Sequence, residues 1–383
     1  MKRLFLPCLF LFACGDDLKA IAPDAHGAVD APQLTDALVH RSRAVVVAPP
    51  VNFGPPPGSL STIDIATLEV RQNVVAGVVG ADPYLRSYGG KLFIINRSTG
   101  NNITILDGKT LAFEEQLGTG ASSNPQDVAV KGQKLYVPGL GTTGVVVLTR
   151  GSSTFTTIDL GTALGDPDGK PDCVSAYLVG NDLFVACDLL DTSFVPRGNG
   201  KVAVIDTTND TFKTSVTLPY KNPQGMFVRT PTDSMLFGDL LIPTAPYYGD
   251  LTQGCLARVS VGATPAASCA ITNAAVGGYE THVDVQVVDG AEMLWMAVST
   301  SFTAGDLRAY DLKTGSLWAM PVNAAMQQIT DVAGCPDGSV VATDAKMNAA
   351  GFRVYKDGVE KTTAAISIGL PPGFGNGLIC ADK

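Results

Sequence analysis

Residues 91–138 read KLFIINRSTGNNITILDGKTLAFEEQLGTGASSNPQDVAVKGQKLYVP, and this stretch decides the fold class of the chain. Three short apolar runs, at 92–95, 103–106 and 113–117, are separated by clusters of Ser, Thr, Gly, Asn and Asp. Two further runs, at 127–130 and 135–137, begin the next copy of the pattern. Short apolar runs bounded by turn residues are typical of strands joined in antiparallel hairpins. The rhythm predicts repeated units of four strands.

An Asp at the end of the third strand marks the same place in five units. The marker residues are Asp64, Asp107, Asp206, Asp311 and Asp357, and the strands at 145–149 and 256–261 occupy the same place without an Asp. The first and last markers are 293 residues apart, or about 49 residues per step, which is the size of a propeller blade. We therefore expect an all-β fold, a seven-bladed β-propeller of four-stranded antiparallel blades. The Asp side chains suit turns, where they accept backbone N–H bonds, better than metal ligation.

The two ends of the repeat array complement one another. The first unit, with runs at 44–50, 60–65 and 70–75, lacks an inner strand, whereas residues 377–381 form a spare strand after the complete last unit. A ring closed by the C-terminal strand in the first blade would remove both open sheet edges. We predict this closure.

Two stretches resemble the YVTN-type propeller repeat. They are residues 92–96 together with 101–107, and residues 201–218. The Trp-Asp dipeptide of WD40 blades is absent, and the paired glycines and aromatics of kelch blades are not repeated. The resemblance implies a propeller over residues 43–383 and supplies no catalytic residues.

The N-terminus is typical of an exported protein. Lys2 and Arg3 precede an apolar run at 4–13, which ends in Leu-Phe-Ala before Cys14. This ending resembles the bacterial lipobox, which implies cleavage after Ala13 and lipidation of Cys14. Gly15 after the cysteine resembles the outer-membrane sorting signal. We expect a signal peptide at 1–13, a lipidated flexible tether at 14–42 and an anchor in the bacterial outer membrane. An ordinary secretory peptide or a short apolar strand is the alternative.

Charge narrows the class of partner. The 383 residues carry 36 Asp and Glu against 27 Lys and Arg, a net charge of -9. Nucleic-acid binding needs a basic footprint, which this chain lacks. An acidic body also gains no attraction from anionic lipid, so acyl chains must supply the anchoring. The expected partners are the membrane, through the lipid, and an envelope protein, a glycan or a small molecule.

Six cysteines remain after the signal and the lipid site, an even number that indicates disulfides in an exported protein. Cys173 and Cys187 flank one predicted hairpin, and Cys255 and Cys269 flank another. Cys335 lies in the last blade and Cys380 in the closing strand, so their pairing would hold the ring shut. Zinc is a poor alternative, because no C-x-x-C occurs and histidine is scarce.

Catalytic side chains are few in the predicted propeller. His282 is its one histidine, so a triad or a multi-histidine metal site is excluded there. Glu280 and Asp284 flank it, which makes the three residues weak catalytic candidates. Other polar residues near the starts of inner strands are expected to line the central channel. With Glu280 and His282, this set comprises Tyr84, Arg86, Gln126, Asp127, Asp172, Gln224, Gln328, Asp331 and Asn376.

Two loops stand out from the regular repeat. Asp166, Asp168 and Asp172 lie on a Gly-bearing loop that is a weak calcium candidate, although the late Glu of an EF-hand is missing. The loop at 243–254 carries Tyr247 and Tyr248, an aromatic pair suited to a partner. The P-loop, the dinucleotide fingerprint, H-E-x-x-H and G-x-S-x-G are all absent.

These observations favour a non-catalytic binding or scaffold propeller at the cell envelope, without a cofactor beyond the calcium candidate. The alternatives are a propeller enzyme of the lyase or dehydrogenase kind, with chemistry around His282, and a purely structural envelope protein.

Overall fold

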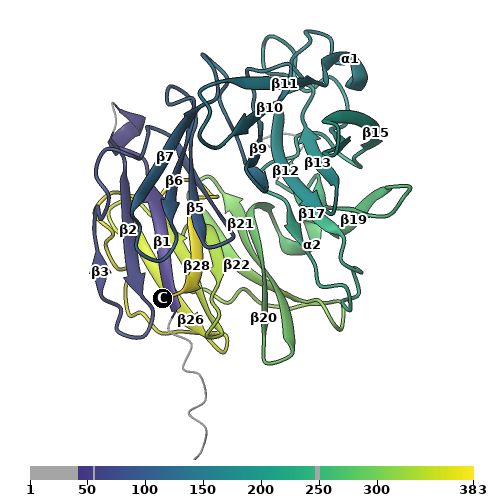
Figure 1. Ribbon diagram of the computed structural model, residues 1–383. Coiled ribbons are helices and arrows are strands. Elements are labelled where there is room, and N and C mark those ends of the chain that lie inside the picture. The colour runs from purple at the N-terminus through teal and green to yellow at the C-terminus, as the bar shows by residue number, and fades with distance from the viewer. Residues whose placement is uncertain (1–41, 55–56, 246–250) are drawn as a thin grey trace, which may run out of the picture. The chain divides into compact units, whose positions relative to one another are not determined.

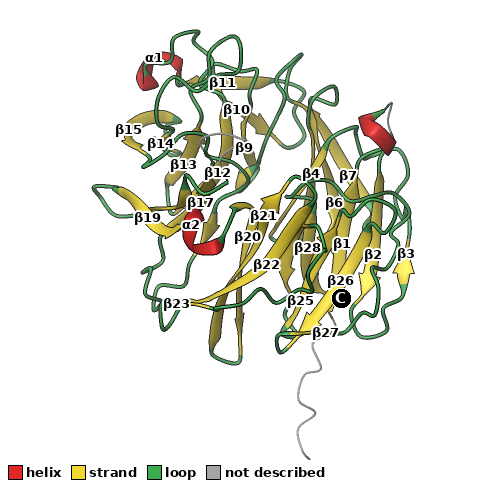
Figure 2. Ribbon diagram, turned by 180° about the vertical axis from the view of Figure 1, so that it is seen from behind, coloured by secondary structure: helices red, strands yellow, loops and turns green. Residues whose placement is uncertain are grey.

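The computed structural model describes residues 42–54, 57–245 and 251–383. The regular secondary structure of these residues is almost entirely short antiparallel strands, arranged as seven four-stranded blades in a ring (Figure 1). Among the described residues, helices are limited to α1 (Gly161–Leu164), α2 (Asn273–Val276) and the single 3₁₀ turn η1 (Val51–Phe53) (Figure 2). The predicted fold class and blade count are confirmed.

The strands of each blade follow one another from the channel outward, and blades are numbered here in chain order. Blade 1 contains β28 (Leu378–Asp382), β1 (Ser42–Ala48), β2 (Ser59–Asp64) and β3 (Val70–Arg71). Blade 2 contains β4 (Pro83–Tyr88), β5 (Lys91–Asn96), β6 (Asn102–Asp107) and β7 (Phe113–Gly118). Blade 3 contains β8 (Ala129–Lys131), β9 (Lys134–Pro138), β10 (Gly144–Thr149) and β11 (Phe155–Asp159). Blade 4 contains β12 (Cys173–Val179), β13 (Asp182–Cys187), β14 (Lys201–Asp206) and β15 (Thr211–Thr217).

The remaining blades repeat the same order. Blade 5 contains β16 (Val228–Arg229), β17 (Leu240–Thr244), β18 (Cys255–Val259) and β19 (Ala267–Thr272). Blade 6 contains β20 (Tyr279–Val288), β21 (Ala291–Ser301), β22 (Ala304–Asp311) and β23 (Ser316–Leu317). Blade 7 contains β24 (Ile329–Gly334), β25 (Ser339–Asp344), β26 (Gly351–Lys356) and β27 (Val359–Glu360). The longest strands, β20 and β21, belong to blade 6.

Buried apolar side chains fill the spaces between the blades. On β5, Leu92 and Ile94 pack towards blade 1, while Phe93 and Ile95 pack towards blade 3. Both faces of the strand are therefore covered, which explains why it reads as a continuous apolar run. The described residues form seven such clusters, one at each junction between neighbouring blades. An open array of seven blades would have only six junctions, so the seventh cluster, between blades 7 and 1, demonstrates closure.

The C-terminal strand closes the ring as predicted. β28 pairs antiparallel with β1, placing Cys380 opposite Ala44 and Leu378 opposite Val46. All three predicted disulfides are present, namely Cys173–Cys187, Cys255–Cys269 and Cys335–Cys380. The third joins blade 7 to the closing strand.

Most of the repeated aspartates form turns, as predicted. Asp64 Oδ1 accepts the backbone N–H groups of Ala66 and Thr67, at 3.0 and 3.1 Å. Asp107, Asp206 and Asp311 accept equivalent bonds from residues two or three positions ahead. Asp357 differs, because it occupies a tight turn with a left-handed φ of 53° before Gly358. Each marker aspartate therefore lies in a turn, and Asp357 does so by a different backbone geometry from the other four.

The closure disulfide should stabilise the fold more than a hairpin disulfide. Cys335 and Cys380 are 45 residues apart, against 14 for Cys255 and Cys269. Chain entropy alone predicts contributions of about 4 and about 3 kcal/mol, respectively. We expect the Cys335→Ser/Cys380→Ser variant to lose about 1 kcal/mol more in free energy of unfolding than Cys255→Ser/Cys269→Ser. Urea denaturation without reductant measures both. An equal or smaller loss for the closure pair would contradict this role.

Candidate functional site

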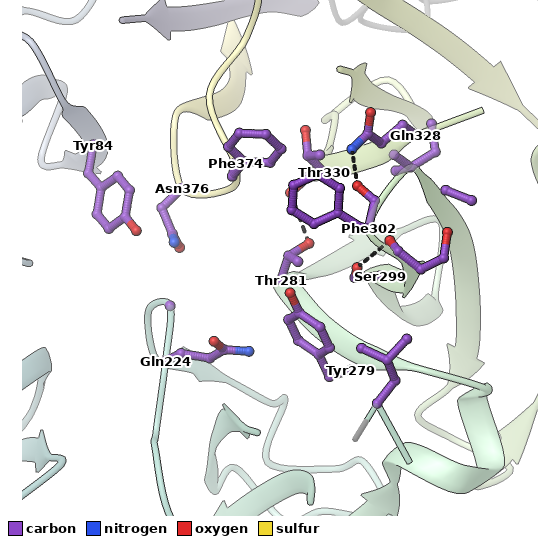
Figure 3. Close-up of a pocket in the computed structure, with 15 residues that line it drawn as sticks. Tyr84, Gln224, Tyr279, Thr281, Ser299, Phe302, Gln328, Thr330, Phe374 and Asn376 are labelled. Carbon is purple, nitrogen blue, oxygen red and sulfur yellow. Dashed lines mark hydrogen bonds between the residues drawn. The ribbon is translucent and has the colours of Figure 1, made fainter. Parts of the chain in front are cut away.

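A cavity of about 610 Å³ lies at the end of the channel where the inner strands begin. Its volume is in the range of small-molecule sites. Residues from blades 1, 2, 5, 6 and 7 line it, and we call it the mouth pocket (Figure 3). The lining residues are Tyr84, Gln224, Gly225, Leu251, Tyr279, Thr281, Ser299, Ser301, Phe302, Ala304, Gln328, Ile329, Thr330, Phe374 and Asn376.

The described lining of the mouth pocket contains no charged side chain. Its polar groups are carboxamides and hydroxyls, and four aromatic rings accompany them. Carboxamides and hydroxyls both donate and accept hydrogen bonds. The pocket can therefore hold a ligand through uncharged hydrogen bonds and ring contacts, without an ion pair to its wall.

Asn376 is a buried polar residue of this pocket. The residue is 2% exposed, and its Oδ1 has no hydrogen-bond partner among the described residues. Gly375 and Asn376 both have left-handed backbones, with φ of 86° and 57°. A Cβ at Gly375 would lie 2.9 Å from the Thr281 carbonyl oxygen, so the chain needs glycine there to approach blade 6. This turn directs the Asn376 carboxamide into the cavity (Figure 3).

Neighbouring blades hold the other polar side chains in place. Gln224 Nε2 donates to the Glu280 carbonyl at 3.1 Å, which orients the Gln224 carboxamide across blades 5 and 6. Thr281 Oγ1 donates to the Thr330 carbonyl at 3.0 Å, joining blades 6 and 7. The wall is thus built from groups that also join the blades.

Two phenylalanines form the rim of the mouth pocket. Phe302, at the tip of the β21–β22 hairpin, is 94% exposed, and Phe374, in the segment before β28, is 61% exposed. Gln328 Nε2 donates to the Phe302 carbonyl at 3.1 Å and so holds the tip of the hairpin. Figure 3 shows both rings on the same side of the cavity, across from Tyr84. The two rings place apolar surface at the edge of the pocket, where it is available to a ligand.

Four of the residues predicted to line the channel are in the mouth pocket. Tyr84, Gln224, Gln328 and Asn376 meet there from four different blades. The two rim phenylalanines were not predicted. The signal that could have found them is that each is the one large apolar residue in a short run of small or polar residues, at 299–303 and 373–377.

Tyr84 and Gln126 both contact the half-buried cation Arg97. The Arg97 guanidinium carbon lies 3.7 Å from the centroid of the Tyr84 ring, a cation–π contact. Arg97 Nη1 donates to Gln126 Oε1 at 2.8 Å, and Asp82 accepts from Nη2 at 2.6 Å. The cation behind the Tyr84 ring is therefore neutralised. Gln126 lies outside the pocket lining and is 5% exposed.

Arg86 and Asp127 form a two-pronged ion pair in the channel. Arg86 Nε and Nη2 each lie 2.8 Å from an oxygen of the fully buried Asp127. Asp127 also accepts from the Ser175 hydroxyl and the Ala176 backbone N–H, at 2.8 and 3.0 Å. Arg86 donates in addition to the Phe227 carbonyl at 3.2 Å. These contacts join blades 2, 3, 4 and 5.

His282 lies beside Asp331, with His282 Nδ1 paired to Asp331 Oδ1. Burial opposes the charged imidazole, but Asp331 and Asp284 outweigh it and raise the pKa of His282 above its usual value. The imidazolium has no lone pair with which to accept a proton, so this arrangement disfavours His282 as a general base. Asp284 is partly buried, and its Oδ2 accepts the Gly334 N–H at 2.8 Å.

Glu280 is fully buried, and neither carboxyl oxygen has a hydrogen-bond partner in the described chain. Burial raises its pKa to about 8, so the group is largely protonated at neutral pH. Tyr279 and Thr281, its neighbours on β20, line the mouth pocket, whereas Glu280 does not. It is a buried acid directly behind the pocket wall.

The acidic loop brings one unpredicted carboxylate close to Asp172. Asp188 follows Cys187, and its N–H donates to the Asp172 carbonyl at 3.0 Å across the hairpin that Cys173–Cys187 joins. Burial raises the pKa of Asp172 to about 7 and that of Asp188 well above its usual value. The position of Asp188 directly after a paired cysteine is the signal that could have found it.

The other two carboxylates of this loop make local turns. Asp166 Oδ2 accepts from the Asp168 N–H at 3.3 Å, and Asp168 Oδ1 accepts from the Lys170 N–H at 2.9 Å. Within the described ranges, no three His, Cys, Asp or Glu side chains are grouped to hold a metal ion. Calcium binding at Asp166, Asp168 and Asp172 stays a prediction.

Several predicted features lie outside the described residues. They are the signal peptide, the Cys14 lipid site, most of the tether, and the Tyr247–Tyr248 pair. In the part of the chain that the structure describes, no helix has the length and apolar character needed to cross a membrane.

The buried Glu280 acid predicts a pH-dependent effect of Glu280→Gln. Its pKa is about 8 in the folded chain and about 4.3 when unfolded, so its contribution to stability falls between these pH values and is constant above them. The carboxamide of the variant cannot ionise. We expect equal melting temperatures at pH 4, and a variant several degrees more stable than the parent at pH 8. The control Glu69→Gln, at an exposed carboxylate, should differ little at either pH. A Glu280→Gln variant without this pH trend would contradict the assignment.

Of the comparisons with known proteins, the one with solved structures bears on this chain, and it bears on the fold alone. No protein-family model matches the sequence, and no curated protein matches it. Among solved structures, apo AztD from Citrobacter koseri is similar, with a TM-score of 0.51 and 12% identity, over 89% of this chain and 98% of AztD. Kuenenia stuttgartiensis hydrazine synthase matches with a TM-score of 0.43 and 16% identity, over 67% of this chain and 74% of that one. The similarity to AztD therefore supports the propeller fold. A sequence identity of 12% supports no conclusion beyond the fold.

Proposed function

We propose that this chain is a binding propeller whose mouth pocket holds an uncharged small molecule or the end of a larger uncharged one. The observation that carries the proposal is the Asn376 carboxamide, buried to 2% exposure with its Oδ1 unpartnered among the described residues. Leaving a buried polar atom without a partner costs about 1–3 kcal/mol. A ligand N–H or O–H group would remove that cost. The atom is therefore placed for a ligand that donates a hydrogen bond.

The lining supports an uncharged ligand. A charged group entering the mouth pocket would lose water and meet no opposite charge on the described wall. The nearby cations Arg86 and Arg97 are already paired with Asp127 and Asp82. Binding is favoured over catalysis because the buried channel carboxylates Asp127 and Asp331 are occupied by backbone N–H groups. The first candidate base, His282, is held by Asp331.

The expected cellular location of this protein is the cell envelope. The lipobox-like end at Cys14 supports a lipid anchor, and Gly15 after it supports the outer membrane. The three disulfides support an oxidising compartment, as exported proteins experience. The resemblance of residues 92–96, 101–107 and 201–218 to the YVTN-type repeat is in keeping with this class of propeller. We propose a lipid-anchored envelope protein that presents the mouth pocket to its ligand.

The ligand proposal is tested by a variant that removes the carboxamide without disturbing the backbone. Asn376 has a left-handed φ of 57°, which glycine adopts readily, so Asn376→Gly deletes only the polar group. In thermal-shift screening of a library of charged and uncharged metabolites, we expect the stabilising compounds to be uncharged. Asn376→Gly should lose their effect. Asn348→Gly is the matched control, since Asn348 is also left-handed, at 66°, and lies outside the pocket.

Two results would contradict the ligand proposal. The first is stabilisation by charged compounds alone. The second is a redox cofactor or metal that co-purifies with the chain, because it would favour the enzyme alternative around His282.

The anchor is tested separately by labelling. Cells that express the full chain should incorporate radiolabelled palmitate into the wild type, whereas Cys14→Ala should remain unlabelled and leave the membrane fraction. Cys8→Ala, within the predicted signal peptide, is the control and should label normally. Unchanged labelling of Cys14→Ala would refute the lipid anchor.

A further inference from the structure

We infer that the ligand of the mouth pocket is a neutral saccharide, bound by the end of its chain of pyranose rings. This inference rests on the proposed binding function and specifies the chemical class of the ligand. A pyranose combines an apolar face of C–H groups with hydroxyls around its edge, and it carries no charge. The mouth pocket provides a counterpart for each of these three properties.

The apolar counterpart is the set of aromatic rings. Phe302 and Phe374 stand at the rim, 94% and 61% exposed, and Tyr84 and Tyr279 also line the cavity. The Phe302 hairpin is held by the Gln328 bond to its carbonyl, so its ring is presented from a fixed backbone. Flat, weakly hydrated rings lose little conformational entropy on binding, and they gain area against a flat apolar face. An exposed pair at the rim suits a chain of rings that extends out of the cavity.

The hydrogen-bonding counterpart is the set of carboxamides. Asn376 Oδ1 needs a donor. Gln224 uses Nε2 on the Glu280 carbonyl, so its oxygen also remains an acceptor for the ligand. A ligand with acceptors alone, such as a quinone or an ester, would leave the buried Asn376 oxygen unsatisfied. Hydroxyl groups satisfy it, because each one both donates and accepts.

The third property is neutrality, which separates neutral sugars from other hydroxyl-rich ligands. Nucleotides, sugar phosphates and uronic acids all carry anionic groups, and the described lining has no Lys, Arg or His to receive them. A peptide is also uncharged along its backbone, and one way in which peptides bind is by adding a strand to an open sheet edge. The free edges of the inner strands face the channel, and aspartates of the neighbouring blades already accept the N–H groups of Ala176, Gly334 and Gly377 there. A neutral saccharide meets all three conditions.

The test is a glycan array followed by calorimetry on the full chain. The array presents neutral hexose and N-acetylhexosamine oligosaccharides beside uronic-acid oligosaccharides. Calorimetry then compares cellopentaose, maltopentaose and chitopentaose with pentagalacturonate. We expect at least one neutral pentasaccharide to bind and pentagalacturonate not to bind.

Variants locate the binding. Asn376→Gly should weaken the affinity by about tenfold or more through loss of a buried hydrogen bond. Phe302→Ala should weaken it by up to about tenfold through loss of a ring contact. Asn348→Gly should bind as the wild type does. Because Phe302 is exposed, its replacement leaves the core intact, and the melting temperature of each variant verifies folding.

Each other outcome overturns a defined claim. If no neutral oligosaccharide binds but another uncharged compound stabilises the chain in an Asn376-dependent way, the saccharide inference is wrong and the binding proposal stands. If only acidic glycans bind, both the inference and the uncharged pocket are wrong. Binding of a neutral sugar that neither Asn376→Gly nor Phe302→Ala weakens would place the sugar elsewhere and refute the inference.

Discussion

The inner strand of every blade has one edge with no strand beside it. The structure depends on how the backbone hydrogen-bonding groups along those edges find partners. Unpaired N–H groups at a buried edge are costly. Here, aspartates of one blade accept N–H groups from the next. Asp127 Oδ2 accepts from Ala176 at 3.0 Å, Asp284 Oδ2 from Gly334 at 2.8 Å, and Asp331 Oδ2 from Gly377 at 2.7 Å. The last of these ties blade 7 to the segment that leads into the closing strand.

Other side chains and the backbone extend these contacts into a continuous ring of hydrogen bonds around the channel, which we call the polar circuit. Ser175 Oγ accepts from the Phe227 N–H at 2.8 Å, joining blades 4 and 5, and the Leu85 N–H donates to the Asn376 carbonyl at 2.8 Å, joining blades 2 and 1. Arg86 on Asp127 joins blades 2 and 3, and Gln224 on the Glu280 carbonyl joins blades 5 and 6. The apolar clusters between the blades provide most of the buried area, while this polar circuit specifies how the inner strands meet.

The circuit also determines what the channel can do. Among the described residues, its charged groups are engaged with one another or with the backbone, so they offer little to a ligand, and the unpartnered Glu280 acid is largely protonated and lies behind the pocket wall. The groups left over are the uncharged ones at the mouth, and Asn376 is the clearest, since its carbonyl serves the circuit while its side chain does not. A propeller closed in this way is suited to binding a neutral ligand at the mouth.

The parts of the fold that were predicted have local signals. The turn aspartates, the spare strand at 377–381 and the spacing of the cysteines each depend on a few neighbouring residues, so the blade count, the closure and the disulfide pairing could all be predicted. Tyr84, Gln224, Gln328 and Asn376 could be predicted because each lies near the start of an inner strand. That Arg86, Asp127 and Asp331 lie outside the mouth pocket could not be predicted. Whether a side chain faces the mouth or the next blade depends on packing between distant segments. The rim phenylalanines project from a hairpin tip and a connecting segment, and their place over the channel is set by the whole ring.

Amide hydrogen exchange of the wild-type chain tests the polar circuit most directly. The account predicts that the backbone N–H groups of Ala176, Gly334 and Gly377 exchange as slowly as those in the middle of the paired strands of their own blades, because aspartate carboxylates of the neighbouring blades hold them. Exchange of these three amides as fast as that of exposed loop residues would contradict it.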